Sequence, residues 1–175
     1  MVAVANPKNA IQMMRPTYRL CDAKQARVKL LHMVPVPDQV PLHDASEYML
    51  EGKEAIVEAM LYLERLFPVT TIISYCRNVA RGIINAVREK KIDLLIVGWH
   101  GQPKKSYGFH FGHTIDPVIE RSPCNVVVLK DVDSNQQFKR ILVPVSGGPN
   151  SGFALEVASM LVDKDDGAIT VFTVA

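Results

Sequence analysis

Apolar runs and helical periods alternate along the first three quarters of the chain. Short runs of apolar or β-branched residues predict strands at 2–5, 28–36, 70–75, 92–97 and 125–129. Amphipathic periods between these runs predict helices at 9–24, 46–67, 78–90 and 114–121. Pro16 falls inside the first helix. Because a proline within a helix costs about 3 kcal/mol, we expect a kink or a late start there.

Strands that alternate with helices predict a parallel sheet with right-handed crossovers. We therefore predict the α/β class, with a doubly wound, five-stranded parallel sheet that is complete by about residue 130. In the helix at 78–90, the spacing of Ile83, Ile84 and Val87 predicts that these side chains face the core.

The last part of the chain repeats the first. After a polar stretch at 131–137, the pattern predicts a strand at 141–145, a helix at 151–162 and a strand at 169–174. A shift of 140 positions aligns the two parts without a gap. We predict a domain at 1–131, a linker at 132–138 and the truncated start of a second repeat at 139–175. A β-α-β unit cannot bury its own faces, so we expect it to pack on the first domain or on another copy, making a dimer.

Composition narrows the class of protein. The 175 residues are 48% hydrophobic and 22% charged with a net charge of +2, which suits a soluble domain and gives no reason to expect a nucleic-acid partner. Three widely spaced cysteines without a CxxC pair indicate a reduced, intracellular protein. No apolar run reaches the roughly 18 residues of a membrane span, and no signal peptide is visible.

The segment that follows the strand at 92–97 is rich in glycine. It contains Gly98 and Gly101, then Gly108, and then Gly112 just before the helix at 114–121. Glycines between a buried strand and a helix let the backbone approach phosphate oxygens, and the amides of the helix start favour an anion. An ordinary loop that needs glycine for positive φ angles explains the same pattern.

In this segment the chain resembles the universal stress protein family. Nucleotide-binding members of that family carry a glycine, two residues, a glycine, nine residues, and then glycine followed by serine or threonine. Gly98 and Gly101 match, but ten residues precede Gly112, His113 takes the hydroxyl position and Thr114 comes one place later. The strand at 123–128 also resembles the end of the family's domain.

The resemblance implies a site for an adenine nucleotide such as ATP, with Mg²⁺ only as a companion of the nucleotide. Relatives usually place an aspartate at the end of the first strand, where this chain has Asn6, which hydrogen-bonds without bringing charge. The predicted binding residues are Asn6, Val34, Gly98, His100, Gly101, Gly112, His113 and Thr114.

A subgroup of the family is also similar to this chain. The runs Ile141–Pro149, Gly98–Gly101 and Thr114–Asp116 resemble tandem domains on the cytoplasmic tails of amino-acid or cation permeases. The resemblance implies a regulatory, ligand-sensing domain in the cytoplasm, with the membrane domain of a transporter as its partner.

Three hypotheses remain open. The first is a regulatory module that binds a nucleotide, the second is a nucleotide-free module that dimerises through the edge of the strand near 126–129, and the third is a hydrolase. Trp99 either covers a base or packs under the loop, and His32 is a weaker candidate in the same crevice. We expect no enzyme and no resident metal, because the sequence has no nucleophile elbow, P-loop, evident general base or compact set of metal ligands.

Overall fold

The computed structural model describes residues 1–5, 7–46, 48, 68–99, 101, 110–130 and 137–173. Five parallel strands form the main sheet in the order β3-β2-β1-β4-β5. They are β1 (Val2–Ala3), β2 (Val28–Pro35), β3 (Val69–Cys76), β4 (Leu94–Trp99) and β5 (Asn125–Lys130). The chain moves outward from β1 on one side and then on the other, so the predicted doubly wound α/β fold is confirmed.

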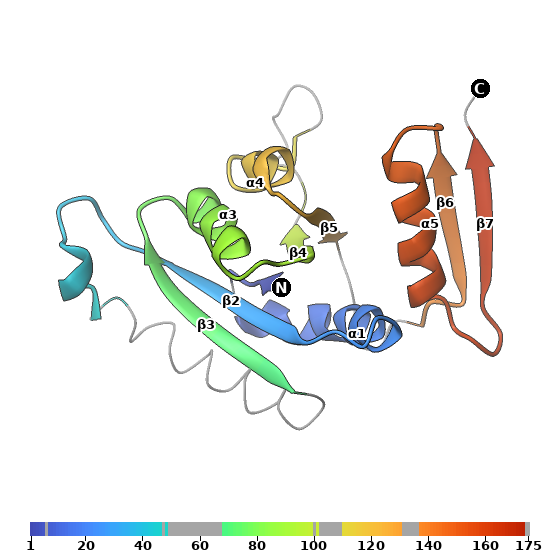
Figure 1. The fold of residues 1–175 in the computed structure, drawn as a ribbon, viewed down its shortest axis with the longest axis horizontal. Helices are drawn as coiled ribbons and strands as arrows, with labels where there is room; N and C mark the ends of the chain where they lie inside the picture. The colour runs from blue at the N-terminus through green and yellow to red at the C-terminus, as the bar shows by residue number, and fades with distance from the viewer. Residues whose placement is uncertain are drawn as a thin grey trace.

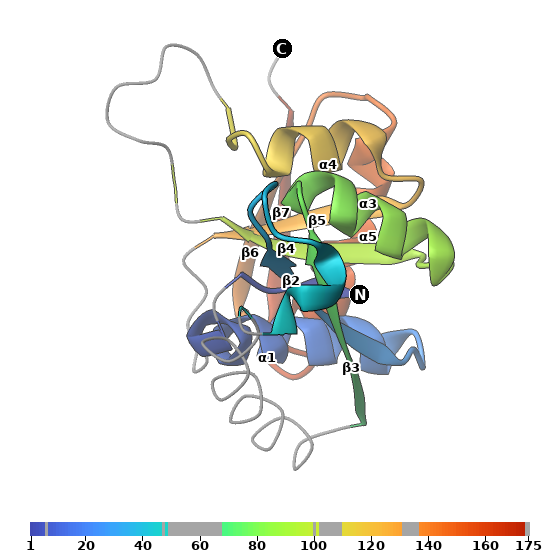
Figure 2. The same ribbon diagram turned by 90° about the vertical axis from the view of Figure 1, so that its left-hand side faces the viewer.

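The described helices lie on both faces of this sheet. They are α1 (Pro7–Ala23), α3 (Val79–Glu89) and α4 (Ile115–Arg121), with a short 3-10 turn, η1 (Leu42–Asp44). Figures 1 and 2 both show α1 on one face and α3 with α4 on the other. The helix predicted at 46–67 lies outside the described residues, apart from helical positions 46 and 48.

Each face of the sheet carries its own apolar cluster. On β2 the neighbouring residues Leu30 and Leu31 are both buried but belong to different clusters, as the two-residue period of a strand requires. Leu31 lies with α3, whose Ile83, Ile84 and Val87 are buried as predicted. The sheet is therefore covered on both sides, which explains the continuous apolar character of its central strands.

Helix α1 differs from the prediction at its proline. It begins at Pro7 and runs through Pro16 to Ala23, so the expected late start is wrong. Pro16 is fully buried, and the neighbouring Thr17 hydroxyl donates to the carbonyl oxygen of Met13 at 2.8 Å. Burial of this face against the sheet compensates for the hydrogen bond that the proline cannot make.

The partial second repeat forms a separate two-stranded parallel sheet with one helix. Its elements are β6 (Arg140–Val145), α5 (Asn150–Leu161) and β7 (Ala168–Thr173). Figure 1 shows α5 between the β6–β7 sheet and the first domain. Val157, Met160 and Leu161 of α5 pack against the cluster under α1. Of the two packing modes predicted for the tail, the structure shows contact with the first domain.

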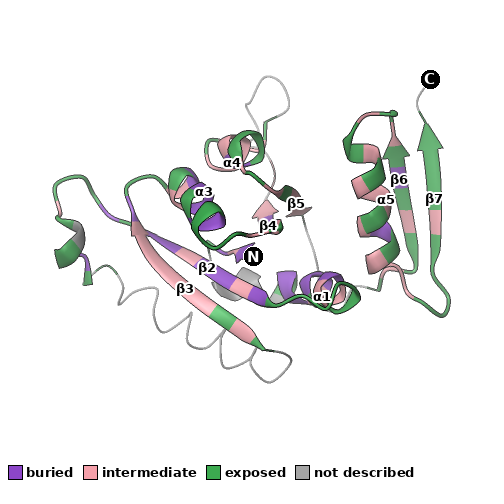
Figure 3. Ribbon diagram, in the orientation of Figure 1, coloured by how far each residue is buried: buried purple, intermediate pink, exposed green. Residues whose placement is uncertain are grey.

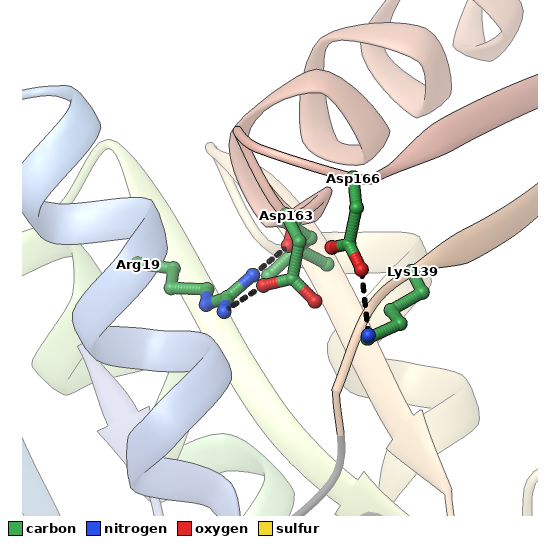
Figure 4. Close-up of polar contacts among 5 residues, drawn as sticks. Arg19, Lys139, Asp163 and Asp166 are labelled. Carbon is green, nitrogen blue, oxygen red and sulfur yellow. Dashed lines mark hydrogen bonds and ion pairs between the residues drawn. The ribbon is translucent and has the colours of Figure 1, made fainter.

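Polar contacts reinforce this joint between α1 and α5. Arg19 forms an ion pair with Asp163 and donates to the carbonyl oxygen of Leu161 at 2.5 Å (Figure 4). Its guanidinium carbon also lies 5.6 Å from the ring centroid of Phe138. Within the second repeat, Lys139 pairs with Asp166 at 2.6 Å. Arg19 therefore connects α1 both to the carboxyl end of α5 and to the loop that follows it.

The two repeats have equal strand spacing but different side-chain phase. The amide of Val4 donates to Leu31, so even-numbered residues of β1 hydrogen-bond toward β2. In the second repeat the amide of Ala168 donates to the carbonyl oxygen of Lys139, so the odd-numbered residues of β6 hydrogen-bond toward β7. The buried residue of β6, Val143, is also odd-numbered. Because one residue of shift turns every side chain to the other face, the 140-position alignment is one residue out of phase.

One part of the second repeat remains uncovered. Figure 3 shows most of β6 and β7 as exposed. Leu142 is 62% exposed, Val171 48% and Phe172 39%, in a two-stranded sheet that is too small to be stable alone. The predicted boundaries of the domains remain predictions, and linker positions 132–136 lie outside the described residues.

Candidate functional site

The predicted site lies at the carboxyl edge of the main sheet. Strands β2, β1 and β4 are neighbours and run parallel, so their carboxyl ends meet at one edge, where open α/β sheets bind ligands. Val34 is buried near the end of β2, and Gly98 lies near the end of β4. Asn6 and His100 lie outside the described residues. The edge therefore brings Val34 and the start of the glycine-rich loop to the same side of the molecule.

Gly98 has a packing role. A Cβ built at this position would lie 3.0 Å from the Met13 sulfur, on the helix that crosses β4. The glycine thus allows α1 to approach the strand closely, which is one of the uses of glycine in this kind of fold.

Gly101 and Gly112 require glycine for a different reason. Their φ angles are +94° and +112°, a region that side chains with a Cβ rarely adopt. Among the described residues other than its chain neighbours, no heavy atom lies within 4 Å of a Cβ built at Gly112, so backbone conformation and not crowding selects glycine there. The two glycines turn the backbone after β4 and before α4, as the loop interpretation requires, and the phosphate site stays a prediction.

Trp99, at the end of β4, packs against described residues beside this loop. Its ring contacts Phe111 edge-on, with centroids 5.0 Å apart and an interplanar angle of 70°. The ammonium of Lys130 lies 5.9 Å from the Trp99 centroid, on the adjacent strand. These contacts favour the packing interpretation of Trp99, and they hold the two ends of the loop, at β4 and before α4, next to each other.

Asp116 binds the backbone amides at the end of the loop. One carboxylate oxygen accepts from the amide of Phe111 at 2.9 Å, and the other accepts from that of Gly112 at 3.3 Å. The Nδ1 atom of His110 lies 3.6 Å from the second oxygen. The sequence alone does not indicate a partner for Asp116. The signal that could have found it is an acidic residue in the first turn of a helix, which commonly reaches back to free amides.

The hydroxyl and imidazole of the predicted motif take no part in this arrangement. Thr114 is the N-cap residue of α4, but its side chain makes no capping hydrogen bond. His113 is exposed. In the part of this segment that the structure describes, the amides of Phe111 and Gly112 bind an anionic group, namely the carboxylate of Asp116.

A second feature missed from the sequence fixes the loop after β2. Arg77 donates to the carbonyl oxygens of Val36 and Pro37, and to that of Val40 at 2.6 Å. These bonds tie the segment that follows β2 to the end of β3, next to the candidate site. Arg77 follows a strand directly, and nothing in its sequence context indicates that its target is a loop some forty positions earlier.

His32 is occupied by a structural contact. Its Nδ1 atom lies 2.9 Å from the carbonyl oxygen of Val4 at the end of β1. The half-buried ring thus joins the residue that follows β1 to the middle of β2.

Elsewhere in the described residues there is less evidence for a functional site. A wide depression of about 540 Å³ lies at the amino edge of β4 and β5, opposite the candidate site. Among the described positions, no group of three or more His, Cys, Asp or Glu side chains is placed to hold a metal. Burial raises the pKa of all three cysteine thiols, so none is activated as a nucleophile. Of the helices that the structure describes, none has both the length and the apolar character of a membrane span.

Comparison with known proteins agrees with this architecture. A family model described as the universal stress protein family matches residues 1–130. Over 68 residues the chain is 40% identical to the Na⁺/H⁺ antiporter NhaS5 of Synechocystis, a match that covers 39% of this chain and 10% of the antiporter. The chain therefore spans only a small part of that relative.

Two solved structures show the same fold. A universal stress protein from Archaeoglobus fulgidus matches with a TM-score of 0.59 at 16% identity, over 73% of this chain and 94% of that one. A universal stress protein in complex with cAMP matches with a TM-score of 0.53 at 17% identity, over 73% and 94%. Because the family model spans most of the chain and the solved relatives share its five-stranded arrangement, this chain belongs to the universal stress protein family.

Proposed function

We propose that this chain is a regulatory, ligand-sensing domain that binds an adenine nucleotide at the carboxyl edge of β2, β1 and β4. The loop between Gly98 and Thr114 would hold the phosphate, with Val34 and Asn6 at the base and ribose, and any Mg²⁺ would arrive with the nucleotide. The domain would act by binding and not by catalysis.

One observation carries this proposal. The amides of Phe111 and Gly112 converge on a single carboxylate, that of Asp116, so the backbone of this loop already binds an anionic group. The positive φ angle of Gly112 helps to turn the backbone where the two amides converge. Such a backbone arrangement suits a phosphate oxygen as well as a carboxylate oxygen.

The relatives support the ligand class and the context. A protein of the same fold is in complex with cAMP, and a relative that shares 40% identity over 68 residues is a Na⁺/H⁺ antiporter. We infer that the domain belongs in the cytoplasm and regulates the membrane part of a transporter. The contact between α5 and α1 gives a route by which a ligand at the first domain would influence the second repeat.

Binding can be tested on the 175-residue chain. Its single tryptophan, Trp99, contacts Phe111 next to the proposed phosphate site, so its fluorescence should change as ATP, AMP or cAMP is added, and the melting temperature should rise. Gly112→Val should weaken binding because valine cannot adopt the backbone angle. Gly152→Ala, in open space on α5, is the matched control and should bind as the wild type does. Absence of both signals at millimolar ligand would exclude the proposal.

A second candidate function is an interaction module that assembles as a homodimer. The exposed Leu142 and Phe172 favour it, because they share one face of the β6–β7 sheet and an exposed apolar surface invites association. The edge of β5 that does not pair with β4 is the other place for such contact. Light scattering should then show a dimer that Phe172→Lys disrupts, while a stable monomer at high concentration would argue against this function.

A further inference from the structure

Asp116 occupies the donors that a bound phosphate would need. Its two carboxylate oxygens accept from the amides of Phe111 and Gly112, and its own amide donates to the Gly112 carbonyl at 3.0 Å. The side chain is 30% exposed, so it is partly shielded from solvent. Both the backbone and the side chain of Asp116 therefore bind this segment, and the carboxylate brings a negative charge to the site.

We propose that Asp116 determines ligand specificity at this loop, by disfavouring ligands with several phosphate charges relative to ligands with few or none. This inference deepens the proposed nucleotide function and rests on it. A phosphate oxygen that approaches Phe111 and Gly112 must replace the carboxylate oxygens, and it must do so beside a like charge. Adenosine or a cyclic monophosphate meets little of this penalty, whereas ATP meets most of it.

A purely structural role for Asp116 is the alternative. An acidic residue in the first turn also stabilises a helix by satisfying free amides, so its loss would lower stability whatever the ligand. Stability alone therefore does not test the inference. The ratio of affinities for two ligands that differ in phosphate charge does test it, because a general loss of loop structure would weaken both.

The decisive variant is Asp116→Asn. The amide side chain keeps one oxygen that can accept from Phe111, removes the negative charge and is nearly the same size. Glu120→Gln is the matched control, because it removes one negative charge from an exposed position of the same helix, α4. Both variants have the same net charge, so a long-range electrostatic effect would appear equally in the two.

Calorimetric titration with adenosine, AMP and ATP gives the first measurement. In Asp116→Asn, the affinity for ATP relative to adenosine should rise about tenfold or more, the usual effect of one nearby like charge. Glu120→Gln should leave that ratio within about twofold of the wild type, since exposed charges are well screened. An unchanged ratio in Asp116→Asn would overturn the inference while leaving the nucleotide function intact.

A titration with inorganic phosphate separates the two proposals. The amide NMR signals of Phe111 and Gly112 should move with added phosphate in Asp116→Asn and much less in the wild type. If they move in this way although no adenine ligand binds, the role of Asp116 stands and the nucleotide function fails. If phosphate moves them in neither protein, the assignment of Asp116 is wrong.

Discussion

Replacement of Arg19 by methionine tests the joint between the two repeats. Arg19 donates to the Leu161 carbonyl at the carboxyl end of α5, where helix carbonyls lack partners and a positive charge is favourable. It also pairs with Asp163, and the two side chains are only 23% and 18% exposed. Methionine keeps much of the apolar stem while it removes the charge and the donors.

The expected loss follows from these contacts. Hydrogen bonds that involve a charged group contribute about 1.5–3 kcal/mol, and the change also leaves Asp163 without its cation. Because both groups retain some contact with solvent, we take about 2 kcal/mol as the weakening of the α5 contact. Since 1.4 kcal/mol corresponds to a factor of ten, the population in which α5 has separated from α1 should rise about 30-fold.

Hydrogen exchange of the α5 amides measures this population, since an undocked 12-residue helix is only marginally stable in water. Lys24→Met is the control. Lys24 pairs with Glu156 across the same joint, but the side chains are 50% and 47% exposed, so the expected loss is about 0.5 kcal/mol or less. Equal exchange rates of α5 in Arg19→Met and Lys24→Met would refute the role assigned to Arg19.

Three further outcomes are expected. Gly112→Ala should lower stability by about 1–3 kcal/mol in thermal unfolding, because alanine is strained at its φ of +112°, whereas Gly152→Ala should be neutral or slightly stabilising; equal melting temperatures would contradict this. Arg77→Met should speed proteolytic cleavage of the loop after β2 several-fold relative to the exposed control Arg81→Met, because Arg77 binds the carbonyl oxygens of that loop. Equal cleavage of the two variants would show that Arg77 does not anchor the loop. Burial raises the pKa of the three cysteine thiols, so a thiol reagent should label the folded chain more slowly than the denatured chain near pH 8. For the same reason the free energy of unfolding should fall as pH rises above 9.0, the pKa of the thiols in the unfolded chain. Fast labelling of the native chain would contradict this.

Most described elements could be predicted because their apolar periods reflect the burial that the fold imposes. The boundary of β4 shows the limit of this signal. Ile92 was predicted to start the strand, but its amide bonds to the Val87 carbonyl at the end of α3, and β4 begins at Leu94. Ile92 is apolar because it packs against the core cluster, so the same pattern serves two backbone conformations.

The candidate site was less predictable than the fold. The glycines at 101 and 112 could be found, since only glycine tolerates their φ angles. The occupancy of the loop by Asp116 and the anchoring by Arg77 depend on where side chains point after folding, which spacing does not encode. Pro16 failed as a helix signal for a similar reason, because tertiary burial outweighed its local cost.

The position of α5 on α1 has a consequence for how this chain responds to small changes. The two surfaces belong to one polypeptide, so their contact is intramolecular, with an effective concentration on the order of millimolar for a short tether. A contact that would be negligible between separate molecules is then closed for much of the time. Each change of 1.4 kcal/mol in this contact shifts the ratio of the form with α5 packed on α1 to the separated form tenfold. A single ion pair such as Arg19–Asp163 is therefore enough to change that ratio markedly.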